Sequence, residues 1–218
     1  MTTEHSVALV HATDEHTQNT FRKLAFQEYL KRGWLNMDAY PDSMVIDAYD
    51  DASAVLVIQS GGEIVSGLRI VHDSEHGFPH EDILALDKFQ RGQSYPHDAM
   101  NMVARTSRTH MAELTRVVGK RRQRMLIFDI AKCVYWYAEK NNIALYLMVV
   151  DMEFFILSNT LGMPLEPIGV PLVCEGSWSI PAITVPSRYP TEVPKKSPRG
   201  WEFISSPDNL LGPWVRPQ

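Results

Sequence analysis

An apolar hairpin is the sequence feature that most limits how this chain folds. Residues 54–58 form a short apolar run rich in β-branched side chains, Gly61-Gly62 follows, and residues 63–71 form a second strand-like run. Glycine pairs between two such runs are typical of tight hairpin turns, because glycine tolerates the positive φ angles that these turns need. The sequence therefore predicts two antiparallel strands of one sheet.

Strands and helices alternate around this hairpin. Residues 17–32 carry apolar side chains at spacings of three and four, which predicts an amphipathic helix ending at Gly33. Residues 112–118 and 144–150 are strand-like, and each is followed by a helical pattern, at residues 125–140 and 152–161. This order predicts an α/β fold: a mixed sheet flanked by helices on both faces, which is a three-layer α-β-α sandwich.

The remaining segments give weaker patterns. Between residues 72 and 110 the periodicity is interrupted by Gly, Pro, His and Asp, which predicts a long surface connection with one short helix at 83–89. Residues 172–174 and 182–185 are strand-like, and a segment rich in Pro, Lys and Ser follows from Pro186. We expect a single domain over residues 1–218, with a core of about 17–186 and an extended, lightly packed tail at 187–218.

Composition excludes several classes of function. A formal net charge of -5 and a pI near 5.9 give no broad positive field for nucleic acid. No apolar run is long enough to span a membrane, and no signal peptide is recognisable. Cys133, Cys174 and the eight histidines show no metal-ligand spacing. We expect a cytoplasmic protein with no metal, no membrane partner and no nucleic acid partner, either a monomer or a weak dimer.

Four short motifs follow one another along the chain. Arg22 and Phe26 are four residues apart on the first helix, and Gly33-Trp34 follows it; then come IDAYD at residues 46–50, GLR at 67–69 and AELTR at 112–116. In this order the motifs resemble those of the acyl-homoserine lactone synthases, autoinducer synthases of quorum sensing with a GNAT-like fold. The resemblance covers roughly residues 20–185. Two spacings depart from the family pattern: Phe26 to Trp34 is two residues longer, and Arg69 to Glu113 is much longer.

The resemblance implies acyl transfer from a thioester to an amine. Such an amine reacts only when neutral, so a proton acceptor and donors for the oxyanion are required. The resemblance assigns Asp47, Asp50 and Glu113 to binding the amino group and, directly or through water, accepting its proton, with Glu113 as the first candidate for the base. Arg116 is grouped with them as a catalytic residue. Those two aspartates share a face in a loop or helical turn, whereas in a regular strand they point oppositely.

Arginines are the expected counter-charges of these carboxylates. Arg22, Arg69 and Arg116 are the matching cations, because nearby positive charge keeps grouped carboxylates ionised. A direct pair between Glu113 and Arg116 needs a β-bulge, since residues three apart on a regular strand face opposite sides. The resemblance assigns S-adenosylmethionine to Arg22, Phe26, Trp34 and Arg69, with the Trp34 face stacking on adenine or covering the sulfonium.

The acyl carrier is expected along the same strand. Its pantetheine arm should run beside Val117 and Val118, with phosphate bound by the basic turn that contains Lys120, Arg121 and Arg124. Candidates for the acyl tunnel are Tyr146, Met148, Phe154, Phe155 and Leu157, although apolar side chains at such spacings are more often plain core. Taken singly, each charged motif also has an ordinary structural explanation, such as a solvated turn for Asp47 and Asp50.

The first functional hypothesis is an acyl-homoserine lactone synthase. It would transfer an acyl group from acyl carrier protein or coenzyme A to the amine of S-adenosylmethionine, and lactone closure would then release methylthioadenosine. The first alternative is an N-acyl amino acid synthase of the same fold, and the second is a catalytically silent domain that binds acyl carrier protein or another partner. No permanently bound cofactor is expected, because both compounds are substrates.

Overall fold

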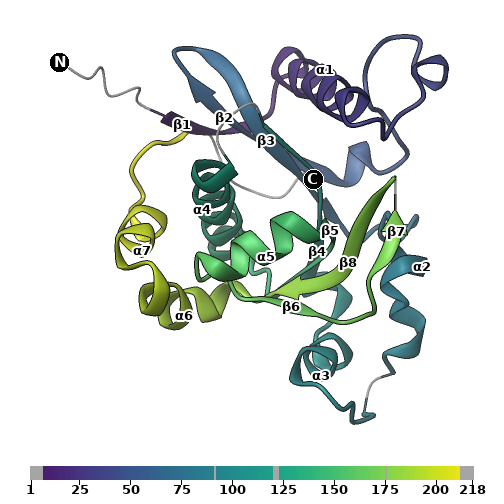
Figure 1. Cartoon of the computed structure of the whole chain (residues 1–218), viewed down its shortest axis with the longest axis vertical. Helices are drawn as coiled ribbons and strands as arrows, with labels where there is room; N and C mark the ends of the chain where they lie inside the picture. Colours follow the sequence, from purple (N-terminus) through teal and green to yellow (C-terminus); the bar gives the residue numbers. More distant parts are fainter. Residues whose placement is uncertain (1–6, 91, 120–122, 175, 212–218) are drawn as a thin grey trace.

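One mixed sheet of nine strands forms the centre of the molecule (Figure 1). The structure is a computed structural model, and it describes residues 7–90, 92–119, 123–174 and 176–211. The strand order is β6-β8-β5-β4-β3-β2-β1-β9, and β7 pairs with β8. The strands are β1 Val7–Ala12, β2 Ser53–Ser60, β3 Glu63–His72, β4 Met111–Gly119, β5 Leu145–Asp151, β6 Leu165–Pro167, β7 Leu172–Cys174, β8 Ser177–Thr184 and β9 Leu210–Leu211. The α-helices are α1 Glu15–Lys31, α2 Glu81–Leu84, α3 Asp98–Arg105, α4 Gln123–Asn141, α5 Met152–Thr160, α6 Tyr189–Lys196 and α7 Pro198–Ser205.

The predicted hairpin is confirmed. β2 and β3 are antiparallel from Ser53↔Val71 to Ser60↔Glu63, and the two turn glycines have φ angles of 62° and 84°. Positive φ at both central positions requires glycine-like freedom, which explains why this pair stands there. A further strand that the sequence analysis did not predict, β1, pairs antiparallel with β2.

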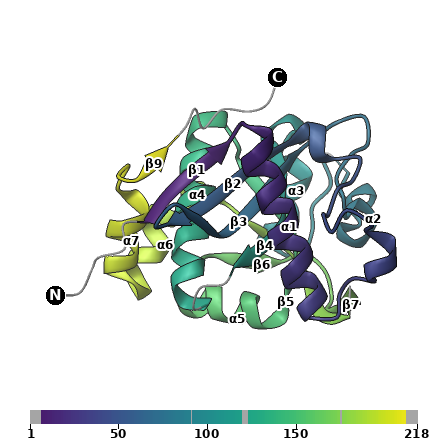
Figure 2. The same ribbon diagram turned by 90° about the horizontal axis from the view of Figure 1, so that it is seen from above.

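Helices cover both faces of the sheet, as the predicted three-layer sandwich requires (Figures 1 and 2). On one face α1 buries Phe21 and Ala25 against Val55 and Val57 of β2. Farther along the sheet, α2 and α3 enclose a second apolar cluster. On the opposite face α4 packs over the central strands within the largest cluster, which also includes side chains of α5, α6 and α7.

The two central parallel strands separate at one end. β4 pairs with β5 only from Met111↔Leu145 to Leu114↔Met148. Beyond that point β4 continues along β3 as far as Gly119, while β5 continues along β8 as far as Asp151. β4 thus stays paired with β3, and β5 stays paired with β8, but β4 and β5 no longer pair with each other. This leaves an opening in the middle of the sheet.

The C-terminal segment is folded, so the prediction of an extended tail was wrong. Residues 186–211 include a 3₁₀ turn, α6, α7 and the short strand β9, which pairs parallel with β1. Tyr189, Val193 and Ile204 are buried in the same cluster as α4. Pro190 and Pro198 stand in the first turns of α6 and α7, where the missing N–H costs nothing, whereas Pro194 lies inside α6.

The long connection between β3 and β4 is also more ordered than expected. It contains α2 near the predicted short helix, and in addition α3, which the sequence analysis did not predict. Phe78, Leu84 and Val103 from this segment are buried against the sheet, so it covers the face beside α1. In the part of the chain that the structure describes, no helix is long and apolar enough to cross a membrane.

Candidate active site

A β-bulge in β4 shapes the site. Gly67 pairs with Val118 and Arg69 pairs with Thr115, so one residue of β3 stands opposite two residues of β4. Arg116 occupies the bulge with a φ of 51°. An extra residue in one strand turns the side chains after it to the other face. The predicted bulge is therefore confirmed, and it places Arg116 on the same face as Arg69.

Five charged side chains meet at this point, and all five belong to the larger set that was expected to converge, which also included Glu113. Arg69 Nη1 donates to Asp47 Oδ1 and Asp50 Oδ1, each at 2.6 Å, and its Nη2 donates to Asp47 Oδ2 at 3.0 Å. Arg116 Nη1 donates to Asp50 Oδ1 at 2.9 Å, and Nη2 donates to Asp47 Oδ2 at 2.8 Å. Arg22 Nε on α1 donates to Asp50 Oδ2 at 3.0 Å.

Local backbone structure lets both aspartates face the arginines. Asp47 lies in a loop, where its Oδ1 also accepts the backbone N–H of Tyr49 at 3.0 Å. Asp50 begins the 3₁₀ turn Asp50–Ala52 directly before β2. The loop geometry expected for these residues is therefore present, since a regular strand would have separated the carboxylates.

The cluster carries an excess of positive charge. Three arginines and two aspartates have a formal sum of +1, and the side chains of Arg69 and Arg116 are only 3% and 4% exposed. Burial by itself raises the pKa of Asp47, but the hydrogen bond and charge of Arg69, together with the charge of Arg116, hold that pKa below its ordinary value. Burial and the neighbouring Arg69 lower the pKa of Arg116.

Glu113 does not join this cluster. Its side chain is fully buried on β4, and both of its oxygens contact His80. Oε2 accepts the backbone N–H of His80 at 3.2 Å, and Oε1 contacts His80 Nδ1. Within the described residues no ion pair links Glu113 to Arg116. The expected pair is therefore replaced by a histidine that sequence reasoning missed, because it lies in the inserted connection, 33 residues before its partner.

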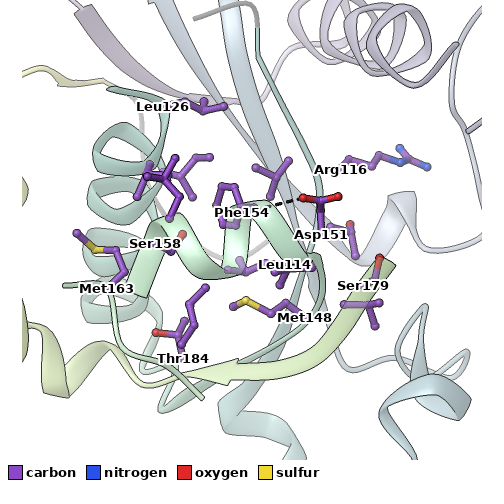
Figure 3. A pocket seen from close by; sticks show the side chains of 18 of the residues that line it. Leu114, Arg116, Leu126, Met148, Asp151, Phe154, Ser158, Met163, Ser179 and Thr184 are labelled. Atoms are coloured by element: carbon purple, nitrogen blue, oxygen red, sulfur yellow. Dashed lines mark hydrogen bonds between the residues drawn. The ribbon is translucent and has the colours of Figure 1, made fainter. Parts of the chain in front are cut away.

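A largely apolar cavity passes through the opening between β4 and β5 (Figure 3). On the α1 side it is lined by Tyr29, Arg32, Trp34, His80 and Arg116. On the other side it is lined by Leu126, Ile130 and Val134 of α4, Phe154 and Leu157 of α5, and Met163, Leu165 and Tyr189 beyond. Figure 3 shows Arg116 at one end of the cavity and Met163 at the other, with Met148 and Phe154 between them.

Some predicted binding residues lie at this cavity. Trp34 lines it, and the guanidinium carbon of Arg32 lies 4.8 Å from the Trp34 ring centroid. Val117 and Met148 are also part of the lining. Arg22 and Arg69 are not among the lining residues; Arg22 donates to Asp50, and Arg69 donates to Asp47.

Other predicted residues lie elsewhere. Phe26 is a buried residue of α1 and lies beside Tyr40, with ring centroids 6.1 Å apart, and Val118 belongs to the same apolar cluster. Phe155 packs against the α4-side core and is not among the lining residues. Apolar periodicity marks these positions as buried, but it does not separate core from cavity wall. Lys120 and Arg121 lie outside the described residues, as does the side chain of Arg124.

No group of three or more His, Cys, Asp or Glu side chains suited to a metal ion occurs among the described residues. A carboxylate–histidine pair and a cationic cluster face one opening, and an apolar channel continues behind it. This arrangement combines a proton acceptor, an anion site and a place for an apolar chain.

The fold is that of acyl-homoserine lactone synthases and related acyltransferases. A solved structure described as "a COA-dependent acyl-homoserine lactone synthase, BjaI, with MTA" has a TM-score of 0.69 and 17% identity, covering 95% of each chain. The structure of FeeM, "an N-acyl amino acid synthase from uncultured soil microbes", has a TM-score of 0.63 and 12% identity, covering 86% of this chain and 94% of that one. Among proteins with curated descriptions, none matches this sequence.

A family model matches a large part of the sequence itself. The model describes the N-acyl amino acid synthase FeeM, and it matches residues 20–154, which is more than half of the chain. This region contains the aspartate–arginine cluster, the bulged strand β4, and the His80–Glu113 pair. The chain belongs to the family of N-acyl amino acid synthases described by FeeM.

Proposed function

We propose that this chain transfers an acyl group from a thioester carrier to the α-amino group of an amino-acid-type acceptor. The observation that carries the proposal is the cavity that passes through the opening between β4 and β5. A thioester carbonyl held in that opening can be approached by an amine from the Arg116 side, while its acyl chain extends toward Met163. Holding both reactants in one geometry removes much of the entropic cost of a bimolecular reaction.

The charged cluster suits an acceptor that carries a carboxylate beside its amine. Its formal excess of one positive charge favours a carboxylate near Arg116, which lines the cavity. Asp47 is the more exposed of the two aspartates, with 37% of its side chain accessible against 9% for Asp50, and we assign it to the ammonium group. An α-amino acid carries both charged groups on one carbon atom.

A free amino acid is the first candidate acceptor. The family match supports it, and so does the environment of Trp34. The guanidinium of Arg32 already lies over that ring, so a sulfonium placed on the same face would meet a like charge. The product is then an N-acyl amino acid.

S-adenosylmethionine is the second candidate, and a specific observation favours it as well. The cluster of Arg22, Arg69 and Arg116 with Asp47 and Asp50 is the constellation in which the chain resembles acyl-homoserine lactone synthases. S-adenosylmethionine is itself an α-amino acid, so its carboxylate and amine would take the same places. Its acylation, followed by lactone closure, gives an acyl-homoserine lactone and methylthioadenosine.

The thioester is proposed to lie along the bulge in β4. The pantetheine arm of coenzyme A or of an acyl carrier protein would run beside Val117, and the acyl chain would pass Met148. Arg116 and Val117 have no partner in the described ladders of β4. We assign their backbone N–H groups to the oxyanion that forms on the thioester carbonyl. We also propose a cytoplasmic location, where both carriers are acylated.

The test is a product analysis with a panel of donors and acceptors. Purified protein is incubated with acyl-coenzyme A or acyl-carrier protein of several chain lengths, together with each amino acid or with S-adenosylmethionine. Free thiol release is followed by absorbance and products are identified by mass. An N-acyl amino acid supports the first acceptor, and a lactone with methylthioadenosine supports the second.

A matched pair of variants distinguishes this site from any other. Arg116→Gln should abolish product formation, because it removes a buried cation from the cavity wall. Arg105→Gln should leave the rate unchanged, since Arg105 is exposed at the end of α3. If the wild-type protein releases no thiol with any pair of substrates, the catalytically silent alternative is favoured instead.

A further inference from the structure

A histidine and a buried carboxylate stand together at the cavity wall, on the side where an amine would enter. His80 lines the cavity with 26% of its side chain exposed, whereas the Glu113 side chain is fully buried behind it. Both oxygens of Glu113 accept from His80, one from the backbone N–H and one at Nδ1. An acyl acceptor in the cavity can therefore reach the imidazole but not the carboxylate.

The segment that carries His80 is fixed by a second charged group. Arg108 lies three residues before β4, and it donates to Asp73 at 2.8 Å and to Glu81 at 2.7 Å. Both ends of the segment 73–81 are therefore bound to Arg108. Glu81 also accepts the backbone N–H of Phe78 at 3.1 Å, and the Arg108 guanidinium lies 4.9 Å from the Phe78 ring. The hydrogen bonds from Arg108 lower the pKa of Glu81. These contacts hold the His80 backbone in place.

The contact with Glu113 also determines the protonation of the ring. A carboxylate beside Nδ1 accepts a hydrogen bond only if Nδ1 carries the proton. In the neutral imidazole, Nε2 then has the lone pair, and this is the nitrogen that can take a proton from a substrate. A carboxylate that orients the imidazole of a catalytic base in this way is a recurring arrangement in acyl-transfer enzymes.

We propose that His80 is the general base of the acyl transfer and that Glu113 is a positioning residue that acts through it. The proposal rests on the acyl-transfer function proposed above and assigns the proton acceptor within that site. It replaces the assignment of Glu113 itself, whose oxygens are both engaged away from the cavity.

The proton and bond changes balance without any further reactant. His80 Nε2 takes one proton from the ammonium group of the acceptor, which leaves a neutral amine. The amine nitrogen bonds to the thioester carbonyl carbon, and the resulting oxyanion collapses as the carbon–sulfur bond breaks. The nitrogen passes its second proton to the departing sulfur, giving an amide and a free thiol. The imidazolium then returns its proton to solvent, to which His80 is partly open.

The test compares His80→Gln with wild type under saturating acyl thioester. We expect kcat to fall about a hundredfold or more, the usual contribution of a general base, while KM for the amine changes little. The decline of kcat/KM toward acid pH that a histidine base produces should disappear. Arg32, Arg116 and Asp151 line the same cavity and Glu113 contacts His80, and all four charged groups remain in the variant. Imidazole added to His80→Ala should restore part of the rate.

Glu113 and a matched control complete the experiment. Glu113→Gln should lower kcat with KM retained, and histidine nitrogen NMR of the wild-type protein should show His80 protonated at Nδ1. His76→Gln is the control, because His76 lies on the same segment with half of its side chain exposed. A His80→Gln variant as active as wild type, or a resting ring protonated at Nε2, overturns the proposed base alone. A wild-type protein that acylates no amine overturns the proposed function as well.

Discussion

Asp50 is the residue on which the charged cluster converges. It accepts from Arg22, Arg69 and Arg116, and 9% of its side chain is exposed. Three cations that share one buried acceptor repel one another once its charge is removed. The stability of the cluster and the geometry of the site therefore depend on the same carboxylate.

Asp50→Asn is expected to lower both the stability of the protein and its activity. Removing one partner of a buried ion pair leaves charge uncompensated, so the free energy of unfolding should fall by about 3 kcal/mol. Product formation should fall on the order of 100-fold, because Arg116 loses a fixed position at the cavity wall. Urea unfolding and steady-state assays at 25 °C measure the two effects. Asp51→Asn is the control: Asp51 is exposed in the same 3₁₀ turn, and an equal loss there would contradict this account.

The sequence could predict the charged cluster but not the histidine. The cluster follows from motifs whose order along the chain matches a known constellation, and two of its five residues, Arg69 and Arg116, lie in recognisable strands. His80 lies in a segment interrupted by Gly and Pro, and its partner Glu113 is 33 residues away. No local spacing reports a contact of that range. The bulge was predicted because a direct contact between Glu113 and Arg116 would require one. In the structure it instead places Arg116 beside Asp47 and Asp50.

Helices α6 and α7 show how proline content misleads at the level of an element. Both begin with proline in the first turn, which is a favourable position, and both contribute to the α4-side core. Strand β1 escaped notice because it is short and isolated in sequence, and its pairing with β2 depends on a contact across about 50 residues. Periodicity predicted the central strands and α4 because each of these elements buries a face of its own.

Gly200 makes α7 an exception to the general rule for glycine in helices. Replacing a helical glycine with alanine usually stabilises a protein by up to about 1 kcal/mol. A Cβ atom at Gly200 would lie 2.3 Å from Phe128 Cε1 and 2.5 Å from Ser197 Oγ, so α7 would have to move away from α4. Gly200→Ala should therefore lower the urea midpoint. Glu202→Ala, at an exposed position of α7, should leave it nearly unchanged. A more stable Gly200→Ala variant would show that the two helices are not packed this closely.

In the whole molecule the opening between β4 and β5 lies in the middle of the sheet, whereas β9 pairs with β1 at its far edge. Global stability and catalysis can therefore respond to pH through different groups. His11 on β1 is 6% exposed, and its ring lies edge-on to Tyr137, with centroids 5.9 Å apart. Its Nδ1 has no hydrogen-bond partner among the described residues. A neutral ring is the form that such a site accepts.

Burial lowers the pKa of His11 below its ordinary value of 6.5. The unfolded chain therefore binds a proton at a pH where the folded protein does not, and stability is lost as pH falls through 6.5 until the folded pKa is passed. His11→Phe keeps an aromatic ring against Tyr137 and removes the titration, so the free energy of unfolding should decline less between pH 7 and pH 5 than in wild type. Urea unfolding at several pH values measures the difference, with His16→Gln, exposed on α1, as the control. Equal slopes in wild type and His11→Phe would mean that the ring is solvated or paired in the folded protein, and the acid sensitivity would then have to arise from other groups.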